Sequence, residues 1–337
     1  MRGKSKLLAI AMLVAVALAA IASGVGQARP GGEAIKVGLV SDVGRFNDKG
    51  FNQLALQGVK RAQKELGATI RPIESRAASD YIPNLSTLAR QKYGLVISVG
   101  FLLADATNTV AKKFPKTQFA IVDYPVVAPP FSGRKNVTGL TFATNQNSYM
   151  IGCLAALMAQ QEGGNTISAV GGIKIPPVDI FIAGYGAGAE KCVAGTKVLV
   201  GYSQDFVAQD KCKEVALDQI QNGSRVVFQV AGGCGLGALD AAKEKGVWGI
   251  GVDNDQSFLG AHILTSAVKR VDVSTFLVSR RLKQGQRLGG FDLVFNLKNS
   301  GVGVGKISSK VPKAFVDQMN ALKQQIIDGV IKPPKTL

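Results

Sequence analysis

The sequence predicts an α/β protein made of two doubly wound domains, each with a parallel sheet covered by helices. Short β-branched runs alternate along the chain with amphipathic segments that repeat every 3.6 residues. The runs are apolar throughout, as expected for strands that helices bury on both faces. The chain has 337 residues, of which 46% are hydrophobic and 19% are charged. That length is enough for two domains with their own cores, and that composition argues against a disordered chain or a coiled coil.

The individual elements can be placed from these patterns. The expected strands are residues 35–40, 95–99, 119–122, 137–142, 166–170, 197–201, 226–230, 248–252 and 263–268. The expected helices with the clearest periodicity are residues 50–66, 149–161, 210–222 and 237–245. Repeated strand–helix units of this kind predict parallel sheets with helices on both faces.

Residues 1–28 have the layout of a secretory signal peptide. Basic residues precede an apolar run at 7–22, and Gly26 and Ala28 stand before a possible cleavage site. A retained membrane anchor is the alternative, but the run is shorter than the roughly 20 residues that a spanning helix needs. The first cysteine is Cys153, so none follows the run to carry a lipid. We expect an exported protein, in the periplasm or at the cell surface, with no lipid-anchor cysteine near the N-terminus.

The chain is strongly basic, with 40 Lys and Arg against 23 Asp and Glu and a net charge of +17. Removal of the expected signal peptide lowers the net charge to +14. No run of five basic residues occurs, and most basic residues stand singly on polar helix faces, so we expect a solvated basic surface and no nucleic-acid partner. Attraction to anionic lipid or to a cell-wall polymer is the alternative.

Metal and cofactor chemistry has little support in the composition. His262 is the single histidine, and the four cysteines include no CxxC pair. This pattern argues against a His-rich metal site, a zinc ribbon and an iron–sulfur cluster. We expect neither a metal nor a cofactor.

Acidic residues stand where several expected strands end. Asp42, Asp123 and Asp253 follow strands directly, and Phe51 opens the first expected helix. Ligands of open α/β sheets bind outside the carboxyl ends of the strands, where such residues converge. Carboxylates there can accept hydrogen bonds from hydroxyl groups, and a flat ring suits a heteroaromatic base. Any one of these aspartates could instead be a helix cap or a turn residue.

A glycine-rich segment offers a competing interpretation. Gly233, Gly235 and Ala238 follow the strand at 226–230 with the spacing G-x-G-x-x-A, and Asp253 lies 20 residues after Gly233. The pattern is typical of dinucleotide-binding enzymes. It lies late in the chain rather than in the first strand–helix turn, and an exported protein rarely meets cytoplasmic NAD. A dehydrogenase is therefore the weaker hypothesis.

Five segments in order along the chain carry a family resemblance. They are SDVGRFNDKGFN at 41–52, NVTGLTF at 136–142, FQVAGG at 228–233, GVDNDQ at 251–256 and NSGVG at 299–303. Together they resemble the basic membrane protein family, the extracytoplasmic substrate-binding proteins of ABC transporters. Several members of that family, including purine-nucleoside-binding lipoproteins, bind purine nucleosides.

The resemblance implies a type I periplasmic-binding-protein fold, with two lobes joined by three hinge crossings. The N-terminal lobe would hold residues 35–142 plus 262–292, and the C-terminal lobe residues 143–261 plus 293–337. The crossings would lie near 142–147, 255–262 and 293–303. A small ligand would bind between the lobes and close them by hinge motion. The expected partners are that ligand and a membrane permease, and we expect a monomer.

The resemblance also implies which residues hold a nucleoside base. Asp42 matches the acid that contacts the base, and Phe51 matches the aromatic residue that stacks on it. Asn47 and Asp48 lie in the same loop and could contact the edges of the base, although Asp48 could equally cap the following helix. Phe181 matches the opposing aromatic residue from the second lobe.

The resemblance also implies a second candidate for the opposing aromatic residue and the residues that hold the sugar. Tyr185 is the substitute candidate for the opposing aromatic, and either residue could instead be part of a helix core. The residues that would hold the sugar hydroxyls are Asp123, Asp253 and Lys269, with close backbone approach at Gly232.

The four cysteines predict disulfides, because exported proteins form them readily. The expected pairs are Cys192 with Cys212 and Cys153 with Cys234, both within the second lobe. Buried free thiols are the alternative, particularly for the second pair. Neither bridge would cross between the lobes, so neither would restrain the hinge.

The sequence thus favours a binding protein that performs no chemistry. Its expected ligand is a purine nucleoside, held by stacking on the base and by carboxylate–hydroxyl hydrogen bonds. The same fold could bind a sugar or another small polar metabolite. A secreted nucleoside hydrolase, a surface adhesin and a sensory ligand-presenter are alternatives of other classes. A hydrolase needs a water-activating base or metal cluster, and no DxDxxxDD run opens the chain.

Overall fold

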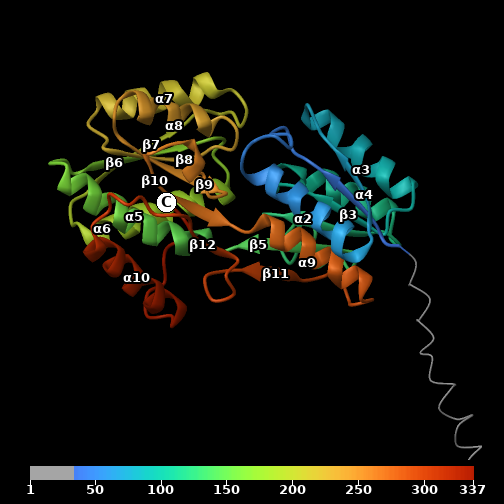
Figure 1. Cartoon of the computed structure of the whole chain (residues 1–337). Helices are drawn as coiled ribbons and strands as arrows, with labels where there is room; N and C mark the ends of the chain where they lie inside the picture. Colours follow the sequence, from blue (N-terminus) through green and yellow to red (C-terminus); the bar gives the residue numbers. More distant parts are fainter. Residues whose placement is uncertain (1–33) are drawn as a thin grey trace, which may run out of the picture. The chain divides into compact units, whose positions relative to one another are not determined.

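Two six-stranded sheets form the framework of the molecule. Figure 1 shows how the helices surround them. The computed structural model describes residues 34–337, and the two sheets belong to one compact unit, Ile35–Leu337. The expected signal peptide, residues 1–28, lies outside the described residues. Among the helices of residues 34–337, none is long and apolar enough to cross a membrane.

The first sheet has its strands in the order β11-β5-β4-β3-β1-β2, and all of its pairings are parallel. Its strands are β1 (Lys36–Val40), β2 (Thr69–Ile73), β3 (Leu95–Ser98), β4 (Gln118–Val122), β5 (Val137–Phe142) and β11 (Asp292–Phe295). Successive side chains of β1 enter different cores, because strand side chains alternate between faces. Val37 and Leu39 belong to one core cluster, whereas Val40 belongs to another.

Helices cover both faces of this sheet. They are α2 (Phe51–Leu66), α3 (Tyr81–Arg90), α4 (Ala104–Lys113) and α9 (Val271–Lys283), with short 3₁₀ turns at Ala78–Asp80 and Phe101–Leu103. Figure 1 shows α9 beside α2, although the two are far apart in the sequence, and Thr275 Oγ1 donates to Ala55 O at 3.1 Å. The pair α3 and α4 packs against the core cluster that contains Val40.

The second sheet has the order β12-β10-β9-β8-β6-β7, with only β12 antiparallel. Its strands are β6 (Thr166–Gly171), β7 (Lys197–Tyr202), β8 (Val226–Val230), β9 (Trp248–Asp253), β10 (Ile263–Lys269) and β12 (Val302–Val304). Its helices are α5 (Thr144–Gln161), α6 (Pro176–Cys192), α7 (Gln209–Gln221), α8 (Gly235–Glu244) and α10 (Lys313–Ile327), and a 3₁₀ turn spans Ser257–Leu259. The helices α5, α6 and α10 contribute to the largest core cluster, whereas α7 and α8 share a smaller one.

Sheet membership differs from the expected lobe boundaries at one strand. Residues 262–292 were expected in the N-terminal lobe, but β10 pairs with β9 and β12 in the second sheet. The chain therefore passes between the sheets at Arg270 rather than within 255–262. The reason is that β9 and β10 are neighbouring parallel strands, and Leu264 and Ala267 of β10 belong to the largest core cluster. The other passages between the sheets follow β5 and β11.

The nine expected strands are present, and the structure has three more that the sequence patterns did not predict. The strand β2 reads TIRPI, contains Pro72 and lies at the sheet edge with most of its residues exposed. Proline is confined largely to such edge positions, so this strand has no continuous apolar signature. The strands β11 and β12 have only four and three residues and are also edge strands. Short edge strands bury too little surface to impose a pattern.

The disulfide pairs differ from those expected. Cys153 is bonded to Cys192, and Cys212 to Cys234, so the expected pairs Cys192–Cys212 and Cys153–Cys234 are wrong. Cys153 lies in α5 and Cys192 ends α6, and these helices pack together. The other two cysteines belong to the core cluster of α7 and α8. The expected pairs would have had to connect helices on opposite faces of the sheet.

Loss of the Cys212–Cys234 bridge should destabilise the second lobe. The bonded residues are 22 positions apart, and closing a loop of that length stabilises a protein by about 3 kcal/mol. The C212A/C234A variant should therefore lose about that free energy of unfolding in urea titrations. Peptide mapping without reduction should recover the pairs Cys153–Cys192 and Cys212–Cys234. Recovery of a Cys192–Cys212 peptide would contradict the structure.

Candidate ligand-binding site

The carboxyl ends of strands from both sheets border one cleft. It contains about 580 Å³ of space that protein atoms do not occupy, part of which is open to solvent. The residues that follow or end the strands supply most of its polar lining: Asp42, Asp123, Gly232, Asp253 and Lys269. Together with Asp48, Phe51 and Phe181, this brings eight of the nine residues expected from the sequence to the same cleft.

Lys269 is the only basic residue among those that line the cleft. Its side chain is 3% exposed, and its Nζ lies 2.5 Å from Asp123 Oδ2 and 4.0 Å from Asp253 Oδ1. Asp123 follows a strand of the first sheet, whereas Asp253 and Lys269 end strands of the second. The ion pair with Asp123 therefore connects the two sheets across the cleft.

Both aspartates beside Lys269 have left-handed backbone conformations. The φ angle is 66° at Asp123 and 62° at Asp253. Among non-glycine residues, Asp and Asn adopt this conformation most readily. A sharp turn after each strand thus brings a short carboxylate into the cleft, in a backbone conformation that β-branched residues adopt only with strain.

Asp42 and Asp48 are organised by Asn52, in the first turn of α2. The Nδ2 of Asn52 donates to Asp42 Oδ1 at 2.8 Å and to Asp48 Oδ2 at 3.2 Å. Asp48 also accepts bonds from the backbone N–H groups of Asn52 and Gln53, so it caps the helix as well as lining the cleft. The Oδ1 of Asn52 is buried and has no hydrogen-bond partner within the described structure.

Aromatic rings from different helices approach Lys269. Its Nζ lies 4.6 Å from the ring centroid of Phe51, on α2, and 5.7 Å from that of Phe181, on α6. Phe142 is a third ring, at 5.1 Å. Distances of this size permit cation–π attraction. Tyr185 does not line the cleft: it is fully buried, with its ring centroid 5.0 Å from that of Phe228.

Asn47 is the expected site residue that the cleft does not include. It is exposed and is absent from the lining, because the tight turn before α2 directs Asp48 inward instead. Sequence reasoning missed Asn52, Gly100 and Phe206, which all line the cleft. Gly100 could have been found, because it follows β3 closely as Asp42 follows β1; its φ is 115°, and a Cβ there would lie 3.0 Å from Asp42 Oδ2.

Burial changes the acid–base behaviour of the carboxyl groups. It raises the pKa of Asp42 to about 6, although the bonds from Gly44 and Asn52 oppose the shift. It raises the pKa of Asp253 to about 7 against the opposing effect of Lys269. Burial also raises the pKa of Asp48 and Asp123. Removal of four carboxylates from water, with one ammonium group nearby, disfavours their charged forms.

The glycine-rich segment serves packing more than ligand approach. A Cβ at Gly235 would overlap the side chain of Gln229, and one at Gly237 would overlap the backbone of Gln209. Only Gly232 of this segment lines the cleft. The spacing that resembles a dinucleotide fingerprint thus has a structural cause, because α8 must lie close to β8 and to the start of α7.

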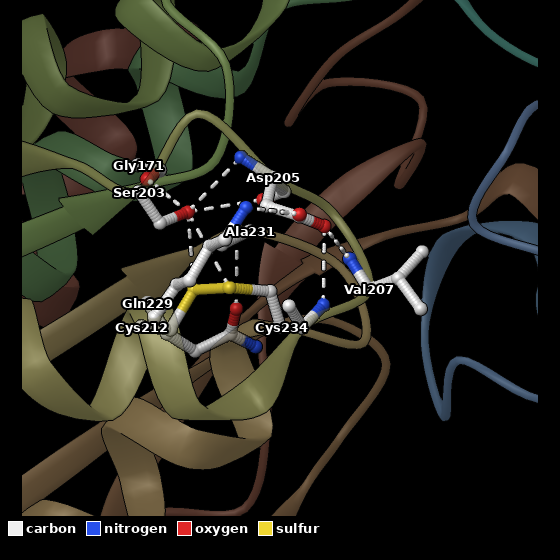
Figure 2. Close-up of a disulfide and its surroundings, with 10 residues drawn as sticks. Gly171, Ser203, Asp205, Val207, Cys212, Gln229, Ala231 and Cys234 are labelled. Atoms are coloured by element: carbon white, nitrogen blue, oxygen red, sulfur yellow. Dashed lines mark hydrogen bonds and ion pairs between the residues drawn. A yellow bond between two sulfur atoms is a disulfide. The ribbon is translucent and has the colours of Figure 1, made fainter.

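The Cys212–Cys234 disulfide connects this glycine segment to the first turn of α7, which follows the loop that carries Phe206. Figure 2 shows the bridge beside Ser203, whose Oγ lies 3.3 Å and 3.4 Å from the two sulfur atoms. The backbone N–H of Cys234 donates to Phe206 O at 3.0 Å. Asp205 stabilises the same loop by accepting the N–H of Val207 at 2.8 Å. One wall of the cleft is therefore held by covalent and hydrogen bonds.

The buried aspartates of the cleft should make the unliganded protein less stable as pH rises. Because the pKa of Asp253 in the folded state exceeds its ordinary value, the native state holds more protons than the unfolded state between about pH 4 and pH 7. The free energy of unfolding should then fall across that interval, and Asp42 acts in the same direction. The D253N variant should show a flatter pH profile in thermal melts. An equal slope in both proteins would contradict this account of Asp253.

Comparisons with known proteins agree with this architecture. A family model described as ABC transporter substrate-binding protein PnrA-like matches residues 35–336. A solved structure of an ABC transporter solute-binding protein from Aeropyrum pernix covers 89% of this chain and 94% of its own, with a TM-score of 0.81 and 25% identity. The type I fold of periplasmic binding proteins, expected from the sequence, is confirmed.

Curated relatives match over nearly their whole lengths. The CD4+ T-cell-stimulating antigen of Listeria innocua is 32% identical over 99% of both chains. The ABC transporter nucleoside-binding protein BmpA of Lactococcus lactis is 34% identical over 89% of both chains. Proteins of this kind bind a small-molecule ligand and interact with a membrane permease. The chain therefore belongs to the basic membrane protein family of ABC transporter substrate-binding proteins.

Proposed function

We propose that this protein captures a purine nucleoside in the cleft and delivers it unaltered to its permease. The base would lie against Phe51 with Phe181 opposite, its edge near Asp42. The sugar would lie at the other end, near Asp123, Asp253, Lys269 and Gly232. The observation that carries the proposal is the combination of aromatic rings from both lobes with buried hydrogen-bond acceptors in one cleft.

The aromatic rings favour a flat ligand. Phe51 comes from α2 and Phe181 from α6, so the two lobes each contribute a ring. Aromatic stacking on a nucleobase is worth about 1–3 kcal/mol for each base. A ligand that touches both rings would hold the lobes together, which links binding to closure.

Two buried acceptors of the cleft lining lack hydrogen bonds within the described structure. They are Asn52 Oδ1 and Asp253 Oδ1, and both residues line the cleft. A buried polar atom without a partner costs roughly 1–3 kcal/mol, so a ligand that donates to it gains that free energy. The N–H groups of a purine base and the hydroxyl groups of ribose are such donors. Ligands without the sugar should be rejected, because they leave Asp253 unpaired.

The charge of the cleft disfavours anionic ligands. Four aspartates line it, with Lys269 as the single basic residue of the lining. A phosphate group would approach these carboxylates, and Lys269 already pairs with Asp123, so little positive charge is left to neutralise the phosphate. The lining therefore supports a neutral nucleoside over a nucleotide. The similarity to BmpA of Lactococcus lactis, an ABC transporter nucleoside-binding protein, supports the same choice.

A ligand panel tests the proposal directly. Thermal unfolding should be measured with adenosine, inosine, guanosine, uridine, ribose, adenine and AMP. A purine nucleoside at about 100 times its Kd should add about 2.7 kcal/mol to the free energy of unfolding. Ribose, adenine and AMP should add much less. Stabilisation by ribose but not by any nucleoside would overturn the assignment in favour of a sugar-binding protein.

The F51A variant tests the stacking role of Phe51. Loss of one stacked ring should weaken binding of the preferred nucleoside roughly 5- to 100-fold in calorimetric titrations, as expected from about 1–3 kcal/mol. Phe258 provides a matched control, because its side chain is 60% exposed and does not line the cleft. The F258A variant should bind as the wild type does. Equal affinities of F51A and wild type would remove Phe51 from the site.

The D253N variant tests the role of Asp253 at the sugar end. Asparagine adopts the left-handed backbone almost as readily as aspartate, so the turn should be preserved. This variant should bind the nucleoside at least tenfold more weakly while its weak affinity for free adenine changes little. An equal loss for nucleoside and free base would place Asp253 away from the sugar.

A further inference from the structure

Two surface hollows lie next to each other at the amino ends of β3, β4 and β5. The first is lined by Lys92, Lys113 and Lys116, with the apolar and small residues of the loops before β3 and β4. The second is lined by Arg134 and Lys135, in the loop before β5. Pro115 belongs to both linings, so the hollows are continuous. Together their linings contain five basic residues and no acidic residue.

Two more basic residues extend this surface along the same sheet edge. Lys36 is the exposed first residue of β1, and its carbonyl group lies near Gly94 in the first hollow. Arg287 is exposed in the loop before β11, and both Arg287 and Lys135 approach Gly290. We call the combined surface the basic face: Lys36, Lys92, Lys113, Lys116, Arg134, Lys135 and Arg287.

The charges of the basic face are not neutralised within the described structure. Six of its seven residues are exposed: five lysines and Arg287. Among residues 34–337, none of these six forms an ion pair with a carboxylate oxygen within 4 Å. Arg134 is half-buried and donates to a neutral partner, Asn108 Oδ1, at 2.8 Å. The acidic residue Asp292 begins β11, but its carboxylate accepts a hydrogen bond from the backbone N–H of Val126 at 2.7 Å and forms no ion pair with the basic face. The face therefore presents a concentrated positive potential to whatever approaches it.

The basic face and the cleft lie at opposite edges of one sheet. The strands of the first sheet are parallel, so their carboxyl ends meet at the cleft and their amino ends at the basic face. Five neighbouring strands, from β11 to β1, span roughly 20 Å at their usual spacing of about 4.8 Å. A partner bound along this edge would leave the cleft accessible.

We infer that the basic face docks the first lobe on an anionic phospholipid surface. The side chains are spread along the sheet edge and exposed, an arrangement that suits many headgroups in a plane better than one enclosed phosphate. Each Lys or Arg near an anionic membrane strengthens binding about fivefold, and salt weakens the attraction. Proteins of this family work with a permease, which is itself embedded in a membrane. Docking would concentrate the protein beside that membrane and leave the lining of the cleft free of lipid contact. The inference does not depend on which ligand the cleft holds.

Vesicle flotation tests the inference. The chain from residue 29 onward contains the whole compact unit Ile35–Leu337 and excludes the apolar run at 7–22. It should float with vesicles of phosphatidylglycerol and phosphatidylcholine in equal parts at about 0.05 M salt, and not with pure phosphatidylcholine. The K113Q/K116Q/K135Q variant should partition roughly 100-fold less. The K113R/K116R/K135R variant should bind as the wild type does, because it retains the charge.

A second triple variant separates the basic face from the net charge of the molecule. Lys323, Lys332 and Lys335 are exposed in the C-terminal segment, which packs with the second sheet's helices, so K323Q/K332Q/K335Q removes the same charge elsewhere. It should retain most of the vesicle binding. Equal losses in the two glutamine variants would overturn the inference, because binding would then follow net charge alone. Displacement by inorganic phosphate, but not by chloride at equal ionic strength, would instead indicate a small-anion site. Circular dichroism of each variant checks that it is folded.

Discussion

One buried ammonium group holds the ligand cleft together. Lys269 ends a strand of the second sheet and pairs with Asp123 of the first, while Asp253 lies at the limit of ion-pair distance. A buried charge is tolerated only where partners compensate for its lost hydration. Without Lys269, the four lining carboxylates would repel one another with no cation among them. The position of β10 in the second sheet therefore matters, because it carries this cation to the cleft.

In the first lobe, the parallel strands place acidic residues at their carboxyl ends and basic residues at their amino ends. Every pairing of the first sheet is parallel, so residues that follow the strands collect at one edge and residues that precede them at the other. Asp42 and Asp123 follow strands and enter the cleft, whereas Lys36, Lys116 and Lys135 lie at or before strand starts and form part of the basic face. One topological fact thus underlies both the acidic cleft and the basic opposite edge.

The packing of helices against the second sheet explains which cysteines are bonded to each other. Each disulfide lies on one face of the sheet: Cys153 of α5 is bonded to Cys192 of α6, and Cys212 of α7 to Cys234, which directly precedes α8. The second of these bridges also positions a wall of the cleft, through the contacts of Ser203 and Cys234 with the loop that carries Phe206. Stability and binding geometry are therefore connected in this lobe.

The sequence by itself determined the α/β class, the apolar strands and most of the polar residues of the cleft. Buried parallel strands leave a strong apolar signal, and the residues that follow them converge whatever the details of packing. Asp42, Asp123 and Asp253 were recognisable for this reason. The short edge strands left no such signal.

Only the tertiary structure decided the disulfide pairs, the sheet to which β10 belongs and the inward orientation of Asp48 rather than Asn47. Each depends on which face of a sheet a helix covers, or on which neighbour a strand pairs with. These are contacts between residues far apart along the chain, so no local spacing encodes them. The pairing of Lys269 with Asp123, 146 residues away, is of the same kind, because only folding brings those two charges together.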